Sequence, residues 1–200
     1  YKRQSESYEA LFLNTPGFKV VVPSNPYDAK GLLIAAIRDE DPVLFMEPKR
    51  IYRAFREAVP AESYTVPIGK AAVAREGSDV TLLSWGAMVR VCLDASEVLA
   101  REDVNAEVVD LRSLNPLDRE TMIESVVKTG RAVVVHEAPR TAGFGAEIVA
   151  QINEHALLQL EAPVLRVAGF DTVFPLAKSE HHYLPSRKRI VDAVKSVLSF

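Results

Sequence analysis

The sequence predicts an α/β protein with a largely parallel sheet that is covered by helices on both faces. Three observations lead to this fold class. Short apolar runs rich in Val, Ile and Leu alternate along the chain with amphipathic segments of about fifteen residues. The runs are apolar throughout, as expected of strands that are buried on both faces of a parallel sheet. The amphipathic segments are long enough to cross from one parallel strand to the next, so we expect a doubly wound topology.

The first part of the chain predicts one βαβ unit that follows a short helix. Asn25 is the expected N-cap of its main helix, with Pro26 at the first helical position, where the missing N–H costs nothing. Residues 49–67 contain two prolines and mixed charge, and we expect them to be a linker. The expected elements are a helix over 5–17, a strand over 18–24, a helix over 25–41 and a strand over 42–48.

The second part repeats the alternation four times. Asn115 and Pro116 form the same Asn-Pro pair as Asn25 and Pro26, and we expect them to start a helix that Gly130 ends as a left-handed C-cap. The expected strands cover 79–86, 106–114, 131–138 and 163–169, and the expected helices cover 87–103, 115–130, 143–160 and 185–200.

Composition bounds the class of protein. The 200 residues are 48% hydrophobic and 26% charged, enough for one ample core or two modest ones. A formal net charge of −3 gives no reason to expect a nucleic-acid partner. No run approaches the roughly 18 apolar residues of a membrane span, so we expect no membrane contact. The single cysteine, Cys92, fits a reducing compartment: the cytoplasm of a bacterium or archaeon, or the mitochondrial matrix of a eukaryote.

The stretch HEAPRTAGFGAEI, residues 136–148, has the composition of a candidate site. It follows a predicted strand, and its glycines open a helix, which is where ligands bind in parallel sheets. The dinucleotide fingerprint is incomplete, because Ile148 stands where its third glycine should be. His136 and Glu137 are neighbours on a strand, so they point to opposite faces and cannot form an acid/base pair. A capping or interface role for His136 is therefore favoured.

The common metal-binding, nucleophile and nucleotide-binding motifs are missing from the sequence. His181 and His182 are expected in a loop, without a third ligand at metal-binding spacing. Ser84 is not part of a G-x-S-x-G elbow, and no P-loop or EF-hand pattern occurs. The residues by themselves leave the site undefined.

Five strings carry a resemblance to a known family: PGFKVVVPSNPYDAKGLLIAAIRDEDPVLFMEPKRIYR, EGSDVTLLSWGAMV, AEVVDLRSLNPLD, KTGRAVVVHEAPRTAGFGAEI and LEAPVLRVAGFDTVFP. They resemble the β subunit of the thiamine-diphosphate-dependent decarboxylase of 2-oxo acid dehydrogenase complexes, and the resemblance covers only the later part of such a subunit. It implies the end of a transketolase-like pyrimidine-binding domain over 1–48, a linker over 49–67 and a transketolase C-terminal-type domain over 68–200.

The resemblance implies oxidative decarboxylation of a small 2-oxo acid, with transfer of the acyl group to lipoate. The substrate stays open, because EPKRIYR and HEAP are closer to branched-chain members and INEHALLQLEAPVLRV is closer to pyruvate members. The implied partners are an α subunit, a second β subunit and the lipoylated acyltransferase core. The alternative is a non-catalytic assembly module that mediates contacts between subunits and with the acyltransferase core.

Cofactors also follow from the resemblance. In the assembled enzyme, thiamine diphosphate lies between the subunits, and the α subunit holds the diphosphate and Mg²⁺. The glutamate that activates the cofactor belongs to a segment upstream of residue 1. We therefore expect this chain by itself to be inactive.

Two sets of site residues are carried over from the family. Its catalytic histidine, within a His-Ser-Gln-Ser-Pro-Glu-Ala stretch, aligns with Gln4, which cannot titrate and so cannot act as a general acid. Some members bind a structural K⁺ at the C-terminal end of the helix that matches 27–39. The matching positions are Ala36, Ile37, Asp39 and Asp41. Free carbonyls and the helix dipole would favour a cation there, and a plain solvated helix end is the other interpretation.

Overall fold

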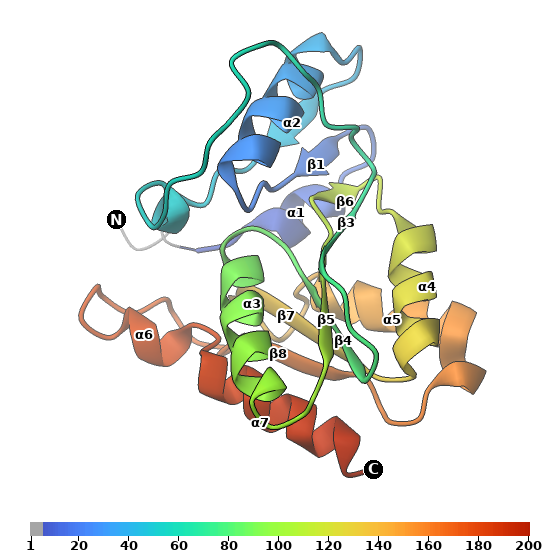
Figure 1. The fold of residues 1–200 in the computed structure, drawn as a ribbon. Coiled ribbons are helices and arrows are strands. Elements are labelled where there is room, and N and C mark those ends of the chain that lie inside the picture. Colours follow the sequence, from blue (N-terminus) through green and yellow to red (C-terminus); the bar gives the residue numbers. More distant parts are fainter. Residues whose placement is uncertain (1–5) are drawn as a thin grey trace.

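The computed structural model describes residues 6–200, which form two sheets with helices packed against them (Figure 1). The smaller sheet has the strand order β2-β1-β6, with β1 parallel to β2 and antiparallel to β6. The Asn25 side chain caps α2 by accepting a hydrogen bond of 2.8 Å from the Asp28 N–H, as predicted. The elements of this part are α1 (Glu9–Leu13), β1 (Lys19–Val21), α2 (Pro26–Arg38), β2 (Val43–Phe45) and β6 (Ser113–Asn115).

The larger sheet has the strand order β3-β5-β4-β7-β8. Strands β5, β4, β7 and β8 are parallel, and β3 pairs antiparallel with β5 at one edge. The predicted fold class, a mostly parallel sheet covered by helices, is thus confirmed. Its strands are β3 (Ala72–Arg75), β4 (Val80–Ser84), β5 (Ala106–Asp110), β7 (Ala132–Pro139) and β8 (Leu165–Gly169).

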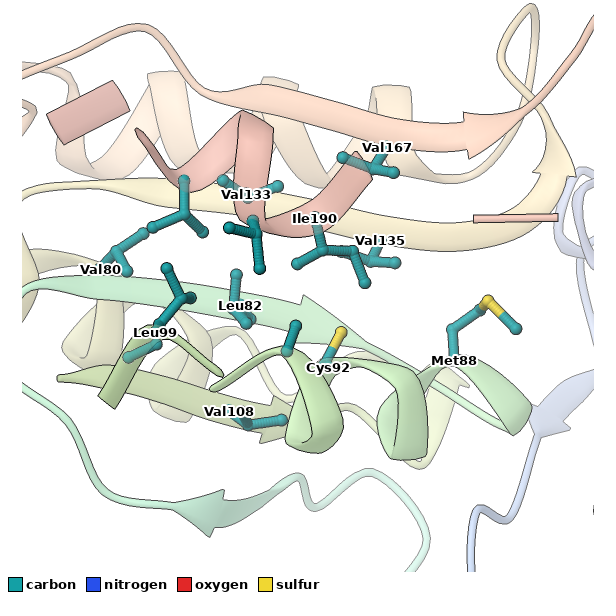
Figure 2. Packing of buried hydrophobic residues seen from close by; sticks show 14 of the residues in the cluster. Val80, Leu82, Met88, Cys92, Leu99, Val108, Val133, Val135, Val167 and Ile190 are labelled. Carbon is teal, nitrogen blue, oxygen red and sulfur yellow. The ribbon is translucent and has the colours of Figure 1, made fainter. Parts of the chain in front are cut away.

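Helices cover both faces of the larger sheet. Figure 2 shows one face, where Cys92 of α3 and Ile190 of α7 pack against Leu82 of β4 and Val135 of β7. The second core lies on the other face, under α4 and α5, and extends to the small sheet through Val20. The helices are α3 (Ala87–Ala100), α4 (Arg119–Thr129), α5 (Gly145–Ala156) and α7 (Arg187–Leu198).

The predicted strand over 106–114 is wrong in its second half. The chain leaves the larger sheet after Asp110, turns at Arg112 with a φ of 55°, and enters the smaller sheet as β6. The backbone N–H of Val22 donates to the Arg112 carbonyl at 2.8 Å, which ties the crossover to the end of β1. The two predicted domains therefore share a sheet.

The predicted start of the helix over 115–130 is also wrong. The Asn115–Pro116 peptide bond is cis, and α4 begins at Arg119 with Asp118 as N-cap, whose carboxylate accepts from the Thr121 N–H at 3.3 Å. Asp118 is buried and well placed as a cap, whereas Asn115 belongs to β6. Gly130 does end the helix in the left-handed conformation, with a φ of 68°, as predicted.

The remaining elements are short. The predicted helix over 5–17 is limited to α1, and the predicted loop with His181 and His182 contains a short helix, contrary to expectation. Within 49–67, the only regular element among the described residues is one 3₁₀ turn. The short elements are η2 (Lys49–Ile51), η3 (Leu157–Gln159) and α6 (Glu180–Tyr183). Among residues 6–200, no helix has the length and apolarity needed to cross a membrane.

Candidate functional site

A cleft of about 620 Å³ opens between the two sheets, where strands of both sheets end. Val22 follows β1, Met46 to Arg50 follow β2, Trp85 and Gly86 follow β4, and Glu137 lies near the end of β7. Ligands of parallel α/β sheets bind outside the carboxyl ends of the strands, so this cleft is the candidate site.

Trp85 and Glu9 are buried side chains that line the cleft. The indole Nε1 donates a hydrogen bond of 3.1 Å to Glu9 Oε1, and each residue is only 4% exposed. Burial raises the pKa of Glu9 above its usual value, although the bond from Trp85 works in the opposite direction. This pair joins α1 to the end of β4.

His136 stacks against the other side of Trp85. The ring centroids lie 5.5 Å apart with an angle of 4° between the planes, and Phe144 meets the indole edge-on. His136 is 1% exposed, and within 6–200 no hydrogen bond of normal geometry reaches either ring nitrogen. Burial, together with Arg166 and Arg140, lowers its pKa to about 4, so the ring is neutral at pH 7. The predicted capping or interface role is wrong, because His136 is a buried core residue.

The glycines of HEAPRTAGFGAEI have a packing role. A Cβ atom at Gly145 would lie 2.5 Å from the His136 ring, and one at Gly143 would lie 2.8 Å from it. Both distances are well below van der Waals contact, so only glycine lets the loop close over the imidazole. The glycines therefore accommodate His136 and need no phosphate ligand to explain them.

Glu137 is a largely buried carboxyl group at the lining of the cleft. Its pKa is raised to about 7, mainly by burial; Arg50 acts to lower it, and repulsion from Glu9 and Glu180 acts to raise it. His136 and Glu137 do lie on opposite sides of the strand, as predicted, because the imidazole packs on Trp85 while the carboxyl lines the cleft. Carboxyl groups outnumber cationic groups along the cleft: Glu6, Glu9, Glu47, Glu137 and Glu180 against Lys49 and Arg50.

A buried polar network holds the two sheets together beside the cleft. The Ser24 hydroxyl donates to the Asp110 carboxylate, and Arg112 contacts both oxygens of Asp28 at 2.9 and 2.8 Å. Burial raises the pKa of Asp110 to about 7, although Ser24 and the Arg112 N–H favour the charged form. Sequence reasoning missed this network, since its members come from the loop between β1 and α2, from α2, from the end of β5 and from the β5–β6 crossover.

The predicted site residues lie apart from the cleft or beyond the described chain. Gln4 lies outside the residues that the structure describes. Asp39 is the C-cap of α2, and its N–H donates to the Ala36 carbonyl at 3.4 Å.

Lys19 supplies a positive charge at the predicted K⁺ position. Its Nζ lies 2.7 Å from Asp39 Oδ1 and 3.0 Å from Asp41 Oδ2, and the bond from Lys19 lowers the pKa of Asp39. A K⁺ ion bound at Ala36, Ile37, Asp39 and Asp41 would share the two carboxylates with the Lys19 ammonium. The K⁺ site stays a prediction. Over residues 6–200, no group of three or more His, Cys, Asp or Glu side chains is arranged to hold a metal ion.

Comparison with known families finds two matches along the chain. The family described as "Transketolase, C-terminal domain" matches residues 69–190, and "Transketolase, pyrimidine binding domain" matches residues 2–54. Among curated proteins, the pyruvate dehydrogenase E1 component subunit beta of Bacillus subtilis (strain 168) is 54% identical over 196 residues. Its counterpart from Staphylococcus epidermidis is 50% identical over 196 residues. The chain is matched over 98% of its length and spans 60% of each of these relatives.

Solved structures share the fold. A split-gene transketolase, described as an inactive beta4 tetramer, superposes with a TM-score of 0.77 at 26% identity, over 95% of this chain and 60% of that one. A transketolase from Pichia stipitis superposes with a TM-score of 0.63 at 13% identity, over 96% of this chain and 26% of that one. The second likeness concerns the fold alone.

Proposed function

The chain belongs to the transketolase C-terminal domain family, and on this basis we propose that it is the later portion of the β subunit of a thiamine-diphosphate-dependent 2-oxo acid decarboxylase. The observation that carries the proposal is the 54% identity with the B. subtilis pyruvate dehydrogenase subunit. Pyruvate is the proposed substrate, because the relatives named above are pyruvate dehydrogenase subunits. A branched-chain 2-oxo acid is the alternative. The acyl group would pass to lipoate.

The cofactor would be held largely by other parts of the enzyme. Thiamine diphosphate supplies a carbanion-stabilising centre when it is bound. The cleft does not fit its diphosphate, because carboxyl groups outnumber cationic groups among its lining residues and no cluster of cations is there to hold a polyanion. We therefore assign the diphosphate and Mg²⁺ to the α subunit.

The proposed partners are an α subunit, a second copy of the β subunit and the lipoylated acyltransferase core. The names of the curated relatives support this, since a "subunit beta" of an "E1 component" is part of a larger assembly. The bacterial sources of these relatives support a cytoplasmic location.

A non-catalytic assembly module is the second candidate. The structural likeness to chains that form an inactive beta4 tetramer favours it, since copies of such a chain can associate without turnover. In that case the chain would bind copies of itself or an α subunit without chemistry of its own.

One experiment separates the two candidates. The protein is purified from its natural source with its co-purifying chains, their intact masses are measured, and carbon dioxide release is followed with thiamine diphosphate and Mg²⁺. The enzyme proposal expects a co-purifying α subunit and release from pyruvate that stops when the cofactor is omitted. A branched-chain 2-oxo acid serves as the comparison substrate. Co-purifying subunits without release from either acid would support the assembly module, and a chain that binds no subunit would contradict both.

A further inference from the structure

Two arginines are bonded to each other at one edge of the larger sheet. Arg140 follows the end of β7, and Arg166 is the second residue of β8, which is an edge strand of that sheet. Arg140 Nη1 donates to the Arg166 carbonyl at 3.1 Å, and Arg166 Nη1 donates to the Arg140 carbonyl at 2.9 Å. These reciprocal bonds hold two positive charges close together, although like charges repel.

A second pair of hydrogen bonds fixes the loops beside the arginines. The Asp171 carboxylate accepts from the Thr141 N–H at 2.8 Å and from the Thr141 hydroxyl at 2.7 Å. These bonds join the loop that follows β7 to the loop that follows β8. Because the two guanidinium groups are already held in place, a ligand that binds them would have little ordering left to bring about.

The two positive charges are not matched by an equal number of negative charges. Neither guanidinium forms an ion pair with any described residue, whereas Arg131 pairs with Glu161 at 2.6 Å. Asp171 is the acid whose charge acts on both arginines, and its two oxygens accept from Thr141. Two cations and one anion leave an excess of one positive charge.

Burial makes this excess charge unfavourable. Arg166 is half-buried, and burial lowers its pKa; repulsion from Arg140 lowers it further, and Asp171 acts in the opposite direction. The positive charges also act on His136, since its pKa is lowered mainly by burial and further by Arg166 and Arg140. Charges that are withdrawn from water in proteins are normally paired, so a half-buried cation without an ion pair indicates an anionic ligand.

We propose that Arg140 and Arg166 bind the carboxylate group of a small organic acid. A guanidinium presents its N–H groups in a planar fork that matches the two oxygens of a carboxylate, and each arginine uses only Nη1 in the reciprocal bonds. A monoanion cancels the excess charge, whereas a phosphate dianion would leave the site negative. The ligand class is therefore a small monocarboxylate, and this inference goes beyond the proposed function and does not depend on it.

The test measures acetate binding by saturation-transfer NMR to the protein purified with its co-purifying chains, without thiamine diphosphate. Acetamide is the control ligand, because it has the size of acetate and no charge. We expect acetate to bind saturably with a dissociation constant in the millimolar range, and acetamide not to bind. Arg140→Gln and Arg166→Gln should each raise the dissociation constant of acetate about tenfold or more, since each removes one charged fork.

Matched variants separate binding from folding. Arg101→Gln makes the same change at the exposed C-cap of α3, and it should leave the acetate affinity unchanged. Arg166→Lys keeps the charge and loses the fork, so its affinity should lie between those of the wild type and Arg166→Gln. Thermal unfolding checks that every variant is folded. Acetate that binds elsewhere on the protein would bind all variants alike.

Three outcomes would overturn the proposal. The first is equal binding of acetate and acetamide, or no saturable binding of acetate. The second is an acetate affinity that Arg166→Gln leaves unchanged, which would mean that the arginines only join β7 to β8. The third is tighter binding of inorganic phosphate than of acetate, which would exclude the monocarboxylate. Because binding is measured without cofactor or turnover, a protein that binds acetate and releases no carbon dioxide would count against the proposed activity and support this site.

Discussion

The indole Nε1 of Trp85 lies 3.1 Å from Glu9 Oε1, and this buried hydrogen bond connects residues that are 76 positions apart. It joins the end of β4 in the larger sheet to α1, which packs on β1 of the smaller sheet. Since Trp85 also stacks on His136, one indole links α1, β4 and β7.

Trp85→Phe is expected to lower the free energy of unfolding by about 1–3 kcal/mol, because the buried Glu9 carboxyl loses its donor. Urea unfolding followed by circular dichroism measures the change. Glu9→Gln is the control. Its amide oxygen can still accept a hydrogen bond from the indole, so its free energy of unfolding should fall by less than that of Trp85→Phe. A Trp85→Phe protein as stable as the wild type would show that the bond contributes nothing.

Gly145→Ala is expected to cost about 1–3 kcal/mol, because its methyl group would overlap the His136 ring. The double variant Gly145→Ala with His136→Ala has no ring to overlap, so its loss should be smaller than the sum of the two single losses. Chemical unfolding of all four proteins completes the cycle. Strict additivity would contradict the packing role of this glycine.

Asp110 should make stability depend on pH. Burial raises its pKa from 3.8 to about 7, so the folded state retains a proton that the unfolded chain has released. Its contribution is fully present below pH 4 and is lost as the pH rises to about 7, by up to roughly 4 kcal/mol at 1.4 kcal/mol per pKa unit.

Asp110→Asn removes this titration and keeps an oxygen for the Arg112 N–H. The difference in unfolding free energy between wild type and variant should therefore change between pH 4 and 7 and stay constant above it. Other titrating groups, such as Glu137, are common to both proteins and cancel. A constant difference across the whole range would mean that Asp110 is ionised throughout.

The predicted K⁺ position can be tested through Lys19. Lys19→Met leaves the Asp39 and Asp41 carboxylates without their ammonium partner, so the variant should be less stable than the wild type. KCl should then raise its melting temperature more than NaCl of equal ionic strength, while the wild type should show no difference between the salts. A K⁺-specific rise in the wild type would instead place the ion beside Lys19.

Gln4→His tests the position of the family's histidine in the assembled enzyme. A histidine titrates near neutral pH and glutamine does not, so the variant should acquire a pH dependence of lipoyl acylation with a midpoint near 6.5. Gln4→Asn is the control, because it retains an amide. An unchanged pH profile would show that residue 4 does not take part in proton transfer.

Local chemistry could be predicted wherever it acts between near neighbours in the chain. The Asn25 cap, the Gly130 C-cap and the apolar strands β4 and β7 depend on residues a few positions away or on a continuous pattern. The edge strand β3 was missed, because it has only four residues and none of them is fully buried. Asn115-Pro116 repeats the local pattern of Asn25-Pro26, but pairing of β6 with β1 prevents a helix start there.

The candidate site could be predicted only in part. The sequence indicated that Glu137 lies at the carboxyl end of a strand and that His136 points the other way, since alternation along a strand is local. It could not indicate that Gly143 and Gly145 close over His136, or that Trp85 meets Glu9, because these contacts depend on how α1 and α5 pack.

The sequence by itself determined the fold class, the alternation of strands and helices, and the family resemblance, because these depend on periodicity and on long runs of residue identities. Only the tertiary structure decided which carboxyl groups share a cleft, why Asp110 and Glu137 hold their protons up to about pH 7, and that Lys19 covers the end of α2. Burial and the distance between charges govern these properties, and both arise only when segments far apart in the chain are packed together.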